Sequence, residues 1–337
     1  MTDVTLNLAG TRSLRPLRQT LAVDAAAVIA IIGVSALLFV LFPGSLALLT
    51  RIVALMLLVL ALDLVTGFAG VGTLGHAALF GAGAYAAGIG AARFGITDPL
   101  AMLGLGAAAG AAAGALSSVV ILRAHGLGQL VLSIAVVQLA HEAANKFSAW
   151  TGGSDGLAGI VPARLFGLYR FDLWGRTSFM LAVAVLVVVF VALRVLVRSP
   201  FGMLCRAIRQ DPVRVKAMGA PVYFTLVKMY IISGAVAGLG GALSTVATKV
   251  VALDSLSFNL SAEALVMLVL GGAGNLFGAM VGTLVFVWFE DLVSAINPFH
   301  WLTVVGLLLI CVVLFAPRGL TGAVAGLWMS RVRGGRS

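Results

Sequence analysis

The sequence FMLAVAVLVVVFVAL, residues 179–193, contains no charged side chain and is almost entirely apolar. A helix that crosses the ~30 Å hydrocarbon core of a bilayer takes about 20 apolar residues, and with its neighbours this run reaches that length. The whole chain shares this character, since 61% of its 337 residues are hydrophobic and 10% are charged. Soluble proteins carry about 25% charged residues. We therefore predict an all-α polytopic membrane protein.

Nine prolines divide the chain into apolar runs, and none falls in the middle of a long run, as helix interiors require. We predict about ten (8–10) transmembrane segments in a single domain, residues 22–317, between a cytoplasmic N-terminal segment, 1–21, and a basic cytoplasmic tail, 318–337. The first apolar run is too long for the core of a signal peptide, so we expect it to remain as the first helix. The expected spans are 22–42, 46–66, 74–92, 99–122, 127–147, 177–197, 226–247, 262–273, 278–296 and 300–316.

The basic residues lie at the ends of the apolar runs. With the N-terminus inside and ten crossings, fifteen of the 22 Lys and Arg residues lie on the cytoplasmic side, which agrees with cytoplasmic retention of positive charge. This topology leaves a large cytoplasmic loop, 198–225, and a large outer loop, 148–176. Because few aromatic residues accompany the basic ones, the net charge of +10 indicates orientation rather than nucleic-acid binding. We expect a multi-pass protein of the bacterial inner (cytoplasmic) membrane with both termini in the cytoplasm.

Two glycine-rich sequences interrupt apolar segments: TGFAGVG at 66–72 and GGAGN at 271–275, after a short expected span. Paired interruptions in the two halves of a membrane protein indicate inverted repeats and a transport pathway between them. We therefore predict broken helices, an inverted repeat and a translocation pathway bordered by both interruptions. The candidate pathway residues are Gly67, Gly70, Gly75, His76, Tyr85, Gln138, Glu142, Gly271, Gly272, Gly274 and Asn275.

Acidic residues at membrane depth are costly, so they suggest function. Asp63 is expected near the inner end of the second span, and Glu142 near the outer end of the fifth, one turn after Gln138. We assign Gln138 and Glu142 to the pathway on this basis, with a solvated position at the end of a span as the alternative.

Small residues recur at the four-residue spacing that lets membrane helices approach closely. This spacing occurs at Gly106, Gly110 and Gly114, at 234 and 238, and at 278 and 282. We expect tight helix packing at these positions, with no direct role in transport.

The chain contains partial matches to motifs for cofactors and metals, but none has the structural context or the full set of residues that the motif requires. Residues 70–75 fit G-x-G-x-x-G but follow an expected membrane helix rather than a strand. Residues 141–145 begin like a zinc-protease motif, but Asn145 stands where the second histidine belongs. No lysine follows a glycine, so there is no phosphate-binding loop. We expect no cofactor, no metal and no catalytic residue; if ATP drives this protein, the ATPase is a separate chain.

The loop 198–225 mixes basic and apolar residues. Pro212 can begin a short helix, and Gly219 suits the left-handed position that ends one. A short amphipathic helix parallel to the membrane is suited to docking into a groove of a partner. Positive-inside retention alone is the alternative explanation of this loop.

The chain resembles the branched-chain amino acid ABC importer permeases, specifically their LivM-type subunits. The resemblance runs through nearly the whole chain after the first expected helix. It is carried by residues 75–85 (GHAALFGAGAY), 151–157 (TGGSDGL), the loop 201–219, 270–278 (LGGAGNLFG) and 317–320 (PRGL).

The resemblance implies a second homologous permease (LivH-type), two cytoplasmic ATP-binding subunits and an extracytoplasmic substrate-binding protein as partners. It implies that a coupling segment contacts the ATPase through Arg206, Ala207, Arg209, Asp211, Pro212, Arg214, Lys216 and Gly219. Lys216 departs from the family, many members of which have an acidic residue there, so the salt-bridge partner is left open. On the outer side, either a docking loop for the binding protein or a structural turn is formed by Thr151, Gly152, Gly153, Ser154 and Asp155.

We therefore expect a permease subunit that moves branched-chain or other neutral aliphatic amino acids by alternating access, with urea or short amides as the alternative cargo. A rival from another class is an independent secondary amino-acid carrier. Such a carrier needs ionisable residues deep in several helices, and here the middles of the expected spans are nearly uncharged. A membrane-embedded enzyme is disfavoured because no set of nucleophile and base can be assembled.

Overall fold

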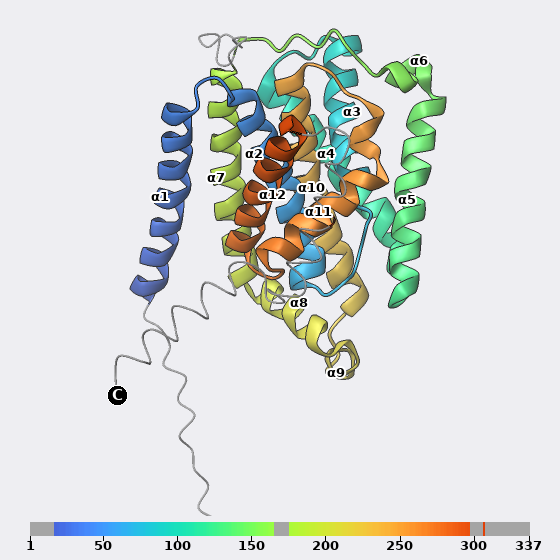
Figure 1. Ribbon diagram of the computed structural model, residues 1–337. Coiled ribbons are helices and arrows are strands. Elements are labelled where there is room, and N and C mark those ends of the chain that lie inside the picture. Colours follow the sequence, from blue (N-terminus) through green and yellow to red (C-terminus); the bar gives the residue numbers. More distant parts are fainter. Residues whose placement is uncertain (1–16, 165–174, 297–305, 307–337) are drawn as a thin grey trace, which may run out of the picture. The chain divides into compact units, whose positions relative to one another are not determined.

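The computed structural model describes residues 17–164, 175–296 and 306, and this part of the chain is built from helices (Figure 1). The long helices are α1 (Leu17–Leu41), α2 (Leu46–Leu62), α3 (His76–Phe94), α4 (Pro99–Ile121), α5 (Leu127–Lys146), α7 (Arg176–Arg198), α10 (Val222–Thr248), α11 (Phe258–Gly271) and α12 (Leu276–Ile296). Shorter elements are η1 (Asp63–Phe68), α6 (Ser148–Thr151), η2 (Gly153–Asp155), α8 (Pro200–Gln210), α9 (Pro212–Ala217) and η3 (Leu253–Leu256).

The chain divides into two compact units, residues 1–43 and 44–337. The first unit contributes α1, a 25-residue helix of largely apolar sequence. The second unit contains all the other helices, and the site described below lies entirely within it.

Nine of the ten expected spans coincide with helices in the described residues, and the tenth, 300–316, lies outside them, as does the tail 318–337. Six of the described helices are long and apolar enough to cross a membrane. They are α2 with its continuation into η1, α4, α5, α7, α10 and α12. The all-α class of the described part is as predicted, whereas the number of crossings and the inverted repeat stay predictions.

Helix α10 packs against α2, α3 and α4 and lies within the core of the second unit. The contact between α4 and α10 depends on glycine, because a Cβ placed on Gly110 would overlap the carbonyl oxygen of Gly234. A Cβ on Gly282 would likewise overlap the carbonyl oxygen of Met267, where α12 crosses α11. The four-residue glycine spacing therefore produces close backbone contact, as expected.

Helix α2 is apolar apart from Thr50 and Arg51, and it is buried along nearly its whole length, the pattern of a helix enclosed by others. Its last part widens into the π-helical turn η1, which contains Asp63 and Gly67. Gly70 follows with φ +77° and turns the chain away from the helix axis. The first predicted interruption is thus a π-helical turn followed by a glycine turn, a feature often found at functional sites.

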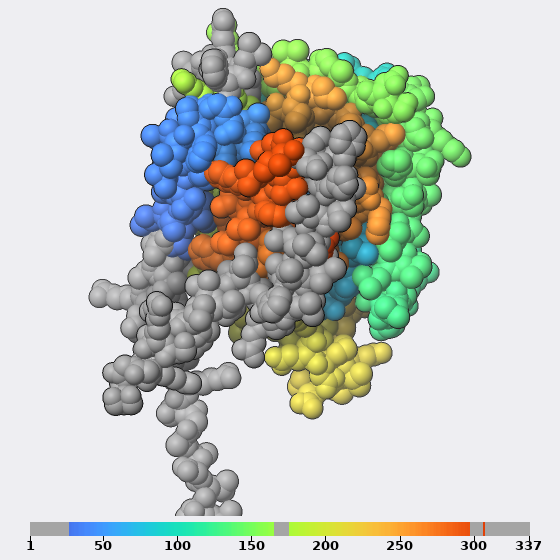
Figure 2. Space-filling view, in the orientation of Figure 1, coloured from blue at the N-terminus to red at the C-terminus, as the bar shows by residue number. Residues whose placement is uncertain are grey.

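The connections α6–η2 and α8–α9 lie at opposite ends of the second unit (Figure 1). At one end, the backbone of Leu157, just after η2, pairs with that of Val251. At the other end, α8 and α9 form a projection from the helical body, seen in yellow in Figure 2. Helix α9 begins at Pro212 and is followed by Gly219 at φ +84°, as predicted.

Helix α8 is an additional element of this loop that the sequence analysis did not separate from α9. The Ser199 hydroxyl caps its first turn by accepting from the Gly202 N–H at 3.3 Å. It buries Gly202, Cys205 and Ile208, which recur every three residues along one side of the helix. An amphipathic helix of this kind rests its apolar face on the bundle and turns its basic face outward.

Candidate functional site

The structure brings the two glycine interruptions into direct contact. The Asp63 carboxylate, fully buried in η1, accepts a hydrogen bond from the backbone N–H of Gly274 through Oδ1 at 2.6 Å. The approach is so close that a Cβ placed on Gly67 would overlap Asp63 Oδ1 and lie 2.5 Å from the Gly274 nitrogen. Only glycine at position 67 therefore leaves room for this bond.

Arg209 of α8 reaches the same place from the loop 198–225. Its guanidinium donates a hydrogen bond to the carbonyl oxygen of Gly67. Gly70 lies against the arginine as well, since a Cβ there would be 2.7 Å from Arg209 Cγ. We call Asp63, Gly67, Arg209 and Gly274 the junction. It links both interruptions to one helix of the loop 198–225, a convergence that the sequence did not predict.

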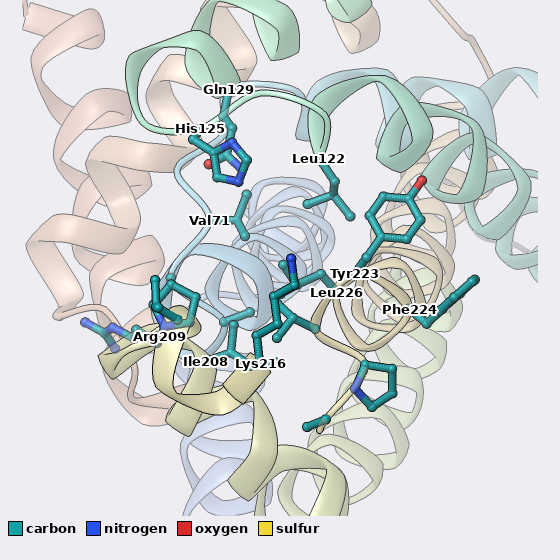
Figure 3. Close-up of a pocket in the computed structure, with 17 residues that line it drawn as sticks. Val71, Leu122, His125, Gln129, Ile208, Arg209, Lys216, Tyr223, Phe224 and Leu226 are labelled. Atoms are coloured by element: carbon teal, nitrogen blue, oxygen red, sulfur yellow. The ribbon is translucent and has the colours of Figure 1, made fainter. Parts of the chain in front are cut away.

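A groove of about 830 Å³ opens beside the junction (Figure 3). One wall comes from the α4–α5 connection and the start of α5, with Leu122, His125 and Gln129. Another comes from α8 and α9, with Ile208 and Lys216. The groove separates α9 from the ends of the long helices, so α9 is held mainly through α8 and the start of α10.

The predicted coupling residues divide into structural and exposed groups. Asp211 is structural, since its Oδ1 accepts from the Arg214 N–H at 2.9 Å and its Oδ2 lies 3.4 Å from Arg214 Nε, which caps α9. Arg206 donates to the carbonyl oxygen of Val197 at 3.0 Å, and its guanidinium lies over the Phe68 ring at 5.2 Å. Ala207 is partly buried. The exposed predicted residues of α9 and the turn after it are Pro212, Arg214, Lys216 and Gly219.

The apolar part of this surface was not among the residues predicted from the sequence. Val213 and Met218 are 76% and 72% exposed. Together with the basic residues of α9 they form a mixed apolar and basic tip. The alternation of apolar and basic residues between 212 and 218 could have indicated this surface from the sequence. Asp63 was noticed as an acidic residue but was not included among the expected site residues.

Two expected pathway residues lie inside the helical core. His76 is 1% exposed, and its Nε2 lies 2.8 Å from the Ser233 hydroxyl, which donates to the carbonyl oxygen of Ala61 at 2.7 Å. Tyr85 is 6% exposed on α3. The His76 contacts join α3 to α10 and, through Ser233, to α2. A pathway role for His76 and Tyr85 stays a prediction.

Gln138 and Glu142 lie on exposed positions of α5, most of which faces away from the bundle. The structure does not bring them to the junction. Near the second interruption, Asn275 Oδ1 accepts from the Phe277 N–H at 3.2 Å at the start of α12. Gly271 is a packing position, because a Cβ there would overlap the Gly278 carbonyl. Gly272 has φ +100°, and Gly75 is buried where α3 begins.

The sequence 151–155, predicted to lie on the outer side, forms a tight turn. The Thr151 hydroxyl donates to the carbonyl oxygen of Ala144 at 2.5 Å, and Gly152 and Gly153 have φ +81° and +60°. Ser154 and Asp155 are exposed at the surface. The structural-turn explanation therefore has direct support, while docking through the two exposed residues stays a prediction.

The profile of one protein family, described as the permease component of branched-chain amino acid transport systems, matches residues 44–314. The chain belongs to this family. The match covers the whole junction, the groove and the projection formed by α8 and α9. This permease component is thus a multi-pass membrane protein and a transporter subunit rather than a catalytic enzyme.

Two curated relatives have the LivM name. The chain is 27% identical over 304 residues to the high-affinity branched-chain amino acid transport system permease protein LivM of Salmonella typhimurium LT2. It is also 27% identical over 306 residues to the LivM protein of Escherichia coli K12. Each comparison covers 84% of this chain and 71% of the relative. No solved structure matches the chain.

Proposed function

We propose that this chain is the LivM-type permease subunit of an ATP-driven importer that moves branched-chain or other neutral aliphatic amino acids by alternating access. The observation that carries the proposal is the junction, in which Arg209 of α8 contacts Gly67 and Asp63 contacts Gly274. A permease needs a mechanical connection between the place where its motor docks and the helices that open. The junction is suited to that connection.

In this mechanism the exposed tip of α9 docks into a groove of a cytoplasmic ATPase, and closure of the ATPase pair moves α8. Arg209 transmits the movement to the π-helical end of α2, and Asp63 transmits it to the start of α12. The interruptions then act as the points at which these helices bend, because π-helical turns and glycine turns yield more readily than regular helix.

The partners in this proposal are a second, LivH-type permease, two ATP-binding subunits and a substrate-binding protein that docks near Ser154 and Asp155. The subunit lies in the bacterial inner membrane with both termini in the cytoplasm. The exposed face of α5, with Gln138 and Glu142, is then available to border a pathway shared with the second permease.

The cargo follows from the chemistry that the chain offers. A zwitterionic amino acid needs donors for its carboxylate, which the N-terminal ends of interrupted helices supply. The names of the two relatives specify branched-chain amino acids. Urea and short amides are the alternative, and they are distinguished by whether they compete with leucine for uptake. An independent secondary carrier would transport without any ATPase subunit.

Gly219→Pro tests the coupling role. Gly219 has φ +84°, and its N–H donates to the carbonyl oxygen of Lys216 at 3.0 Å. Proline fixes φ near −65° and has no N–H, so it disrupts the turn that positions α9. We expect leucine uptake to be abolished in cells that carry the whole transporter, with normal insertion of the subunit and reduced recovery of the ATPase on purification.

Gly95→Pro is the matched control, since Gly95 also has φ +67° at the end of a helix but lies at the opposite end of the second unit from α9. Both substitutions impose the same local strain. If Gly219→Pro supports normal uptake, the coupling role is wrong; if both variants lose uptake equally, the loss comes from strain rather than coupling.

A further inference from the structure

A separate cavity, of about 350 Å³, lies in the second unit at the end remote from α9. Helix α10 begins just after α9 and is 27 residues long, or about 40 Å at 1.5 Å per residue. Ser244 and Thr248, in its last turns, line this cavity. The volume suits a ligand of the size of an amino acid, since cavities for small molecules start at about 300 Å³.

The wall of this cavity is largely apolar. Leu55 of α2, Phe80 of α3 and Leu260 of α11 contribute to it. Helix α2 leads into the first interruption, and α11 ends at Gly271, where the second one begins. A ligand in the cavity therefore contacts both of the helices that end at the interruptions, and an aliphatic group on that ligand is removed from water.

Two charged side chains also line the cavity, Arg51 and Asp254. Arg51 is engaged, since its Nη2 lies 3.5 Å from Glu290 Oε1. The Asp254 carboxylate, on η3, makes no hydrogen bond or ion pair with the residues that the structure describes. The Ser244 hydroxyl makes none either within this part of the chain. The wall thus offers a carboxylate and a hydroxyl as acceptors for a positively charged group.

A buried hydroxyl lies near the same carboxylate. Tyr85 of α3 is 6% exposed, and its Oη has no hydrogen-bond partner among the described residues. It is close enough to Asp254 to interact with it electrostatically. Buried polar groups without partners are rare in folded proteins. A neutral hydroxyl does not neutralise a carboxylate, so the negative charge of Asp254 is left for a cationic ligand.

We propose that this cavity binds the transported amino acid, with its ammonium group on Asp254 and its aliphatic side chain against the apolar wall. This step rests on the proposed function and on its orientation, in which this end of the chain faces outward, where the cargo arrives. An ammonium group has three donors, and hydrogen bonds between charged groups are about twice as strong as neutral ones. The cavity therefore favours an amino acid over urea or a short amide, which have no ammonium group.

The test measures binding by the full chain purified with its transporter subunits, without the substrate-binding protein. Radiolabelled leucine is the probe. Three compounds compete with it: isopentylamine, which lacks the carboxylate of leucine, isocaproate, which lacks the ammonium group, and urea. We expect isopentylamine to displace leucine at concentrations about tenfold below those that isocaproate or urea requires, because it alone of the three carries the cation.

Asp254→Asn removes the charge and keeps the size, and it should lower the affinity for leucine about tenfold, which corresponds to ~1.4 kcal/mol. Asp291→Asn is the matched control, since Asp291 is an exposed aspartate of α12 that does not line the cavity, and it should bind as the unaltered protein does. Asp254→Glu keeps the charge and should recover much of the binding, which separates loss of charge from poor folding. Leu260→Ala should lower the preference for leucine over alanine several-fold.

Equal affinity for leucine in the unaltered protein and Asp254→Asn overturns the proposal, as does equal competition by isopentylamine and isocaproate. Absence of leucine binding by the unaltered protein also overturns it. Leucine uptake by cells that carry the whole transporter is measured separately and decides the proposed function. Normal uptake together with unchanged binding by Asp254→Asn removes this site and leaves the function standing, whereas absence of ATP-dependent leucine uptake with the unaltered chain refutes the function itself.

Discussion

Gly67→Ala is the sharpest perturbation of the junction, because a single added methyl group meets two of its members. The new Cβ would overlap Asp63 Oδ1 and lie 2.5 Å from the Gly274 nitrogen. Neither group can retreat easily: Asp63 is fully buried, and the Gly274 nitrogen belongs to the backbone. We expect the Asp63 side chain to move and its hydrogen bond to Gly274 to break.

The size of the effect can be worked from these contacts. Leaving a buried donor or acceptor without its hydrogen bond costs about 1–3 kcal/mol. Overpacking a tight site adds about 1–3 kcal/mol. The two costs do not add in full, because the surrounding structure relaxes in part. We therefore expect this local arrangement to lose roughly 3 kcal/mol of stability, and we expect weaker transmission of movement from α8 to α12. Uptake should fall by more than tenfold if coupling depends on this arrangement.

Gly72→Ala is the matched control, since Gly72 belongs to the same interruption but a Cβ there meets only Leu130, at 3.6 Å, an ordinary contact. Both variants are compared for leucine uptake, for amount in the membrane and for ATPase activity of the purified transporter. We expect Gly67→Ala to keep ATP hydrolysis while losing uptake, and Gly72→Ala to stay within about twofold of normal. Equal uptake by the two variants would refute the reasoning.

Two further predictions concern packing and thiol chemistry. Gly110→Ala should lower the apparent melting temperature, because the methyl group would overlap the Gly234 carbonyl. Gly104→Ala on the same helix is the control, since a Cβ there has nothing within 4 Å and should leave the melting temperature unchanged. The two variants are compared by thermal unfolding in detergent, and equal melting temperatures would contradict close packing of α4 on α10. Burial raises the pKa of the Cys205 thiol from 9.0 to about 11, so the thiol stays protonated and unreactive at pH 8. The contribution of the buried neutral thiol to the free energy of unfolding is complete below pH 9 and is lost as the pH rises toward 11. Maleimide labelling at pH 8 should therefore require unfolding, and rapid labelling of Cys205 in the folded protein would show that α8 leaves the bundle.

The sequence alone predicted the membrane class, the approximate limits of most helices and the short helix that begins at Pro212. These features are local: a run of about 20 apolar residues, a proline at a helix start and a glycine with positive φ each carry their own physical signal. The glycine spacing on α4 and α10 also predicted close packing, because the cost of a side chain between two backbones depends little on the rest of the fold.

Only the tertiary structure decided which of these features meet. Asp63 and Gly274 are 211 positions apart, and Arg209 and Gly67 are 142 apart, so their contacts depend on how α2, α8 and α12 pack. The same packing placed His76 and Tyr85 in the core and left Gln138 and Glu142 on an exposed helix. Residue type and spacing fix what a segment can form, whereas the neighbours of a buried carboxylate or a guanidinium are set by long-range packing. Here that packing joins two distant interruptions to one short helix, α8.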